Sequence, residues 1–178
     1  LGNLSLLRKE LAFAADFMKA GVWGTDNITA TAWDDANGDP IADIIDAAAV
    51  ISGATGIMPN TLIVGAVVDQ ALRKSAKIRE TIRYVQATTM SAVRAAIAGA
   101  LGIENYLVST AIYDTANEGQ AASYAPIIDD DALLLYVNPD SGWRGVSSGK
   151  TFVWQPGGGA GSIYSHYNND RHATIIQH

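Results

Sequence analysis

The segment from Gly145 to Thr151 carries the clearest hint of ligand chemistry, because it ends in the Gly-Lys-Thr of a phosphate-binding loop. That motif also needs a glycine five residues before Gly149, where this chain has Arg144. It further needs a strand before it and a helix after it, so that the N-terminus of the helix faces the phosphates. Residues 151–154 are typical of a strand instead. We interpret the segment as a turn, and a nucleotide-binding or other small-molecule-binding α+β domain is the weakest of our alternatives.

Two other groups of side chains suggest metal binding. His166, His172 and His178 recur at six-residue spacing, but they face one way only if the tail is one continuous strand, and no carboxylate cluster accompanies them. The triplet from Asp129 to Asp131 directly precedes an apolar strand, which is typical of a turn. Cysteine is absent, and no serine, histidine and aspartate suggest a catalytic triad. The sequence therefore predicts no metal, no cofactor and no enzyme.

Charge and hydropathy exclude further classes of protein. The 178 residues carry a formal net charge of -6, so the overall field repels phosphate and argues against nucleic-acid recognition as the main function. No apolar run approaches the roughly 20 residues that span a bilayer, so we expect no membrane partner. The chain does not begin with methionine, and we expect it to be a piece of a longer protein.

Hydrophobic periodicity and turn residues predict a mixture of helices and strands, hence an α+β fold. We expect a helix over residues 4–20 that ends at Gly21, and a second helix that begins at Asp39-Pro40 and ends at Gly53 or Gly56. A third helix should place Val67, Val68, Ala71 and Leu72 inward, and a fourth should run from Thr89 to Gly102. The expected strands are 61–64, 106–113, 132–137 and 151–154, with one or two more in the tail, 162–178.

Two kinds of side chain are candidates for contact with other molecules. The four tryptophans lie in or beside linkers, where they either pack back on their own domain or anchor a partner. A basic run over residues 73–83 is either a solvated face or a contact for an acidic neighbouring subunit. The candidate subunit contacts are Trp23, Trp33, Arg73, Lys77, Arg79, Arg83 and Trp143.

The order of these segments resembles the major capsid proteins of tailed bacteriophages, the family with the Hong Kong 97 fold. The most specific segment is Thr55 to Gly65, in which Gly56-Ile57-Met58-Pro59-Asn60 precedes an apolar strand. The other segments that carry the likeness are 7–26, 33–41, 77–84, 102–108, 116–120 and 131–136.

This resemblance implies a mixed sheet flanked by helices. Residues 1–35 would be part of a peripheral domain with the end of its spine helix. Residues 36–160 would form the axial domain, and 161–178 would return into a truncated peripheral domain.

The resemblance also implies a structural role. Copies of the chain would form an icosahedral shell around phage DNA, close to that DNA but without specific contacts to it. The protein would be made in the cytoplasm of the bacterial host and located in the virion capsid. A nanocompartment (encapsulin-like) shell protein, which shares the fold, is the alternative. The arm and loop that the family has before the spine helix are missing here, so we expect this fragment to be monomeric or weakly associated.

Overall fold

The computed structural model describes residues 2–26, 29, 31–85, 89–140, 142, 144–152, 164–168 and 173–177. The chain divides into two compact units, residues 1–146 and 147–178, and each is described by itself. This division does not test the assignment of peripheral and axial domains, which stays a prediction.

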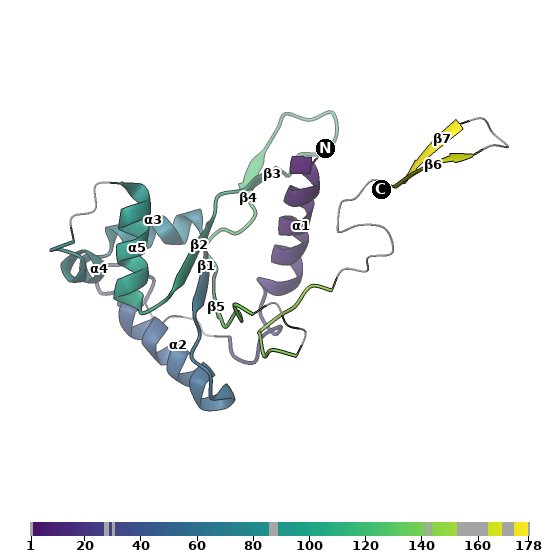
Figure 1. Cartoon of the computed structure of the whole chain (residues 1–178). Coiled ribbons are helices and arrows are strands. Elements are labelled where there is room, and N and C mark those ends of the chain that lie inside the picture. The colour runs from purple at the N-terminus through teal and green to yellow at the C-terminus, as the bar shows by residue number, and fades with distance from the viewer. Residues whose placement is uncertain are drawn as a thin grey trace. The chain divides into compact units, whose positions relative to one another are not determined.

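The first unit contains five helices and five strands among its described residues (Figure 1). The helices are α1 (Gly2–Phe17), α2 (Pro40–Thr55), α3 (Ala66–Lys74), α4 (Ala76–Thr81) and α5 (Met90–Leu101). The strands are β1 (Thr61–Gly65), β2 (Asn105–Ser109), β3 (Ile112–Asp114), β4 (Tyr124–Pro126) and β5 (Ala132–Leu135). The predicted α+β class is confirmed.

A three-stranded mixed sheet of order β2-β1-β5 forms the centre of this unit. The central strand β1 pairs in parallel with β2 and antiparallel with β5, so that Ile63 lies opposite both Leu107 and Leu133. Four of the five residues of β1 are buried, as its unbroken apolar run predicted. The helices α2 to α5 lie on one side of the sheet and α1 lies on the other (Figure 1).

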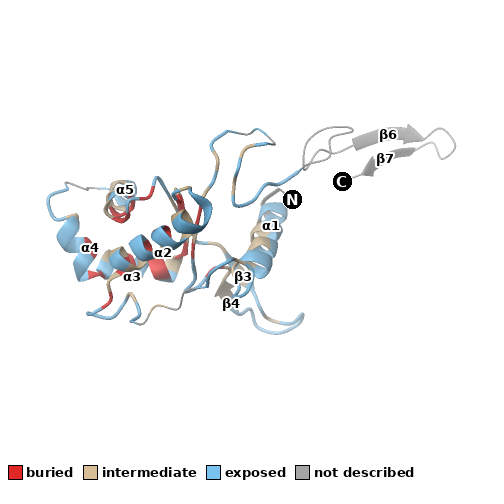
Figure 2. Cartoon of the chain, turned by 90° about the horizontal axis from the view of Figure 1, so that it is seen from below, coloured by how far each residue is buried: buried red, intermediate tan, exposed pale blue. Residues whose placement is uncertain are grey.

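The hydrophobic core lies between this sheet and the helices α2 to α5 (Figure 2). Its buried members are Ile44, Leu62, Val64, Val68, Leu72, Ile78, Ile97, Leu101 and Ile103. Every one of those four helices and the central strand contributes a side chain, so the core holds the outer helices to the sheet.

Capping residues set the ends of α2 and α5, as predicted from the sequence. The side chain of Asp39 accepts a hydrogen bond from the amide of Ala42 at 3.2 Å, and Pro40 occupies the first turn of α2. Thr89 caps α5 in the same way. The helices end at Gly56 and Gly102, whose φ angles of 72° and 69° are left-handed.

The predicted end of the first helix was wrong, because α1 stops at Phe17 rather than near residue 20. The indole N–H of Trp23 donates to the carbonyl oxygen of Phe17 at 2.7 Å, and the two rings lie 6.0 Å apart. A side chain thus satisfies a carbonyl that would otherwise accept from the next turn. Gly21 has a left-handed φ of 82°, but it lies in the connection beyond the helix.

The predicted strand over residues 106–113 was also wrong, since it is two strands in different sheets. Strand β2 pairs with β1, whereas β3 pairs with β4 in a separate two-stranded sheet. On α3, Val67 was expected to point inward but is 49% exposed, and Asp69 is buried instead. The described residues 151 and 152 are not in a strand.

The Pro-Asn motif before β1 has a structural explanation. The side-chain oxygen of Asn60 accepts from the amide of Val137 at 2.9 Å, and its side-chain nitrogen donates to the carbonyl of Val137 at 2.8 Å. Asn60 therefore extends the pairing between β1 and β5 by one side chain. At the other end of β1, a Cβ on Gly65 would overlap the carbonyl oxygens of Ile128 and Asp129, so only glycine fits there.

The second unit contains an antiparallel pair of strands, β6 (Tyr164–Asn168) and β7 (Ala173–Gln177). The tail is thus two strands rather than one. The continuous strand that a metal site built on the three tail histidines would need is absent, because β6 ends at Asn168. His172 and His178 lie outside the described residues.

Candidate functional site

The described tryptophans among the candidate contacts pack against their own chain. Trp23 caps α1, as described above. The indole N–H of Trp33 donates to the carboxylate of Asp43 on α2 at 2.7 Å, and its half-buried ring packs on the hydrophobic core. Trp143 lies outside the described residues. A role of these residues in subunit contacts stays a prediction.

The four predicted cationic contacts lie along α3, α4 and the residues after them. Arg73 forms an ion pair with Asp69 at 3.2 Å, and Lys77 forms one with Asp39 at 3.8 Å. The guanidinium of Arg83 lies 5.5 Å from the ring centre of Tyr84, within range of a cation–π interaction. Arg79 is exposed on α4. Their contact with a second subunit also stays a prediction.

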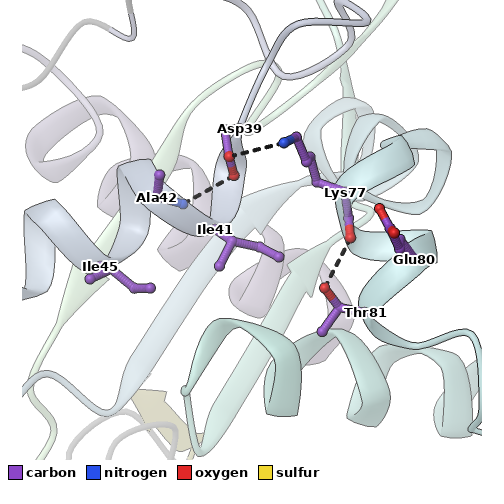
Figure 3. A pocket seen from close by; sticks show the side chains of 7 residues that line it. All are labelled: Asp39, Ile41, Ala42, Ile45, Lys77, Glu80 and Thr81. Carbon is purple, nitrogen blue, oxygen red and sulfur yellow. Dashed lines mark hydrogen bonds and ion pairs between the residues drawn. The ribbon is translucent and has the colours of Figure 1, made fainter.

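A hollow of about 320 Å³ lies between α2 and α4 (Figure 3). It is lined by Asp39, Ile41, Ala42, Ile45, Lys77, Glu80 and Thr81. Asp39 points toward the ammonium of Lys77, with which it is paired, and also caps α2. Asp39 and Lys77 are thus engaged in structural contacts, and the seven lining residues include no arrangement of nucleophile and base.

A buried polar network that the sequence pattern did not predict is centred on Asp69, whose side chain is only 2% exposed. Its carboxylate pairs with Arg73 and with Arg94, each at 3.2 Å, and accepts a hydrogen bond from the hydroxyl of Tyr106 at 3.0 Å. Burial, followed by the negative charge of Asp69, raises the pKa of the Tyr106 phenol far above its usual value. The network ties α3, α5 and β2 together.

Another polar contact joins α1 to the sheet. The hydroxyl of Ser109, at the end of β2, donates to the carboxylate of Glu10 at 2.6 Å. No residue of α1 whose side chain is described is fully buried, and Leu4, Leu6, Leu11 and Phe17 are exposed. Helix α1 therefore has more apolar surface than the rest of its own chain covers.

The phosphate-loop hypothesis finds no support in the described part of the chain. Residues 144–152 contain no helix after the Gly-Lys-Thr sequence and no strand before it. Among the described residues, no three histidine or acidic side chains cluster closely enough to hold a metal ion. Burial, followed by the negative charges of Asp130 and Asp129, raises the pKa of the Asp131 carboxyl.

None of the described helices is both long enough and apolar enough to cross a lipid bilayer.

Comparisons with known proteins find a matching family model and similar solved structures. The family model for phage major capsid protein E matches residues 21–144. The structure is similar to the crystal structure of a phage-related protein from Bordetella bronchiseptica RB50, with 21% sequence identity and a TM-score of 0.76 over 98% of this chain. This chain spans 57% of the length of that protein. No curated protein matches the sequence.

Proposed function

Because the chain belongs to the phage major capsid protein E family, we propose that it is a structural subunit of an icosahedral shell that encloses phage DNA. The family match over residues 21–144 carries this proposal. Copies of the chain are then its principal partners, and the virion capsid is its location after synthesis in the cytoplasm of the bacterial host. Its role is structural rather than catalytic.

The surface of the first unit supports such a role. A shell subunit must bury side chains against its neighbours, and apolar side chains of α1 remain exposed within one copy. A net charge of -6 suits a wall that encloses DNA without binding it tightly. The side chains of Asp39, Asn60 and Asp69 are engaged in a helix cap, a contact between strands and an ion pair rather than converging on a substrate.

Purified phage particles from a cell that encodes the chain provide the test. Mass spectrometry should find its peptides as the most abundant protein of DNA-filled heads, and an antiserum against the chain should label those heads. Particles that contain this protein but hold protein cargo and no DNA would favour the nanocompartment alternative. Confinement of the protein to tails, or its absence from particles, would contradict a capsid role.

We also expect this chain, taken by itself, to be monomeric or weakly associated. Sedimentation velocity over a range of concentrations measures this association. Closed shells formed by this chain alone would contradict the expectation. A saturable rise in melting temperature with a nucleotide would instead favour a nucleotide-binding domain.

A further inference from the structure

Positive and negative side chains are segregated along the chain. Residues 70–103 contain six lysines and arginines and one acidic residue, Glu80. Residues 104–143 contain seven acidic residues and no lysine or arginine. Two neighbouring segments of one chain therefore carry opposite charges, against a net charge of -6 for the whole.

The basic segment forms an exposed surface around α4, which we call the basic surface: Lys74, Arg79, Arg83, Tyr84 and Met90. Tyr84 is 86% exposed although it lies beside the guanidinium of Arg83. Tyrosine, arginine and methionine are residue types that are enriched where proteins contact one another. The basic surface thus combines charge with apolar area, as a contact site does.

The acidic segment contains an opposite surface between β4 and β5. Asp129, Asp130 and Asp131 are all exposed, and no cation pairs with them among the described residues. The amide of Gly65 donates to the carbonyl oxygen of Asp131 at 3.3 Å, which fixes this segment to the end of β1. These three residues are the acidic surface.

The two surfaces belong to different parts of the first unit. Helix α4 packs on the other helices α2, α3 and α5, whereas the acidic surface joins two strands. Figure 1 shows α4 among the helices on one side of the sheet, whereas the acidic surface lies at the end of β1, where the amide of Gly65 holds Asp131. Opposite charges on different surfaces of one molecule suit a head-to-tail contact between copies, which closes into a ring when the rotation allows.

We propose that the basic surface of one copy binds the acidic surface of a second copy. This contact rests on the proposed function, because it names one of the contacts by which shell subunits associate. The chain itself supplies a partner of complementary charge, and its net negative charge opposes the other evident partner, a nucleic acid.

The absence of cysteine allows a direct test by cross-linking. Val85→Cys places a thiol beside the basic surface, and Ala132→Cys places one beside the acidic surface; both positions are exposed and neither change alters a charge. A mixture of the two single-cysteine chains, treated with a short bis-maleimide, should give a cross-linked heterodimer. The rate of cross-linking should fall at 1 M salt, because the distance over which charges interact drops to about 3 Å from about 10 Å at 0.1 M.

Charge reversal separates this contact from association in general. Arg79→Glu with Arg83→Glu, made in the Val85→Cys chain, should slow cross-linking about tenfold. Asp129→Lys with Asp130→Lys, made in the Ala132→Cys chain, should do the same. Mixing the two reversed chains should restore the rate, which loss of folding cannot do.

The matched control reverses two cations elsewhere. Arg8→Glu with Lys9→Glu on α1 makes the same change of charge and should leave the cross-linking rate unaltered.

Several results would overturn the contact. An unaltered chain that associates in sedimentation, but cross-links at a rate insensitive to both reversals, would remove this contact and leave the proposed function standing. Failure of the two reversed chains to restore the rate would do the same. Loss of cross-linking on addition of duplex DNA, with a gel shift that Arg79→Glu and Arg83→Glu abolish, would assign the basic surface to nucleic acid. Absence of the protein from phage heads would remove the proposed function itself.

Discussion

Replacement of Asp69 by alanine should destabilise the protein strongly, because three partners depend on one buried carboxylate. The change removes ion pairs at 3.2 Å to Arg73 and to Arg94 and a hydrogen bond at 3.0 Å from Tyr106. Removal of one partner from a buried ionic network costs about 3–5 kcal/mol. The side chains of Arg73 and Arg94 are 31% and 36% exposed, so water can solvate part of their unpaired charge. We therefore expect the free energy of unfolding to fall by about 3 kcal/mol, at the low end of this range.

Urea denaturation followed by circular dichroism measures this loss as a change in the free energy of unfolding. A loss of that size should lower the melting temperature by about 6–12 °C in a chain of this length. Asp69→Asn should cost less than Asp69→Ala, because the amide oxygen still accepts from Tyr106. Asp130→Ala is the matched control, and as an exposed change it should stay within about 0.5 kcal/mol of the unaltered chain.

Two results would refute the reasoning. A cost of Asp69→Ala below about 1 kcal/mol would mean that the network contributes no more than an exposed ion pair. A cost of Tyr106→Phe equal to that of Asp69→Ala would mean that the phenol, and not the carboxylate, is the centre of the network.

Three further changes test other contacts. Asn60→Ala should lower the free energy of unfolding in urea by about 1–2 kcal/mol, because both hydrogen bonds to the backbone of Val137 are lost. A cost near zero would mean that these two hydrogen bonds do not stabilise the pairing of β1 with β5. Gly65→Ala should cost more than about 2 kcal/mol and lower the yield of folded protein, since its Cβ would overlap the carbonyl oxygen of Asp129; full stability would show that this segment moves freely. Burial and Asp69 raise the pKa of Tyr106 in the folded state, so its contribution is present below the ordinary value of 10.0 and is lost as the pH rises above it. The free energy of unfolding should therefore decline more steeply above pH 10 in the unaltered chain than in Tyr106→Phe, and equal slopes would refute the shift.

The family and the α+β capsid-type fold were predictable from the sequence, and both predictions are confirmed. Helix ends were predictable where the signal is local. Asp39 and Thr89 cap the helices that directly follow them, α2 and α5, and Gly56 directly follows the last residue of α2. The end of α1 could not be predicted in this way, because it depends on Trp23, which lies beyond the helix and donates a hydrogen bond to the carbonyl oxygen of Phe17.

The network of Asp69 escaped prediction because its partners are distant in sequence. Arg94 lies 25 residues away and Tyr106 lies 37 residues away, on different elements. One local signal was present: Asp69 lies between Val68 and Leu72 on the buried side of α3, where an unpaired acid is costly. An acidic residue within an apolar stripe therefore predicts a buried partner, although not which one.

The position of β1 between two strands from later in the sequence has a consequence for synthesis on the ribosome. Its partners are Asn105–Ser109 on one edge and Ala132–Leu135 on the other, so neither ladder can form from neighbouring residues. Each closes a long loop, which favours slow folding. Until β5 has left the ribosome, one edge of the apolar strand β1 stays unpaired. Such an edge can pair with other nascent chains and cause aggregation. Chaperone binding should therefore be strongest over this interval of translation and should decline once β5 has emerged.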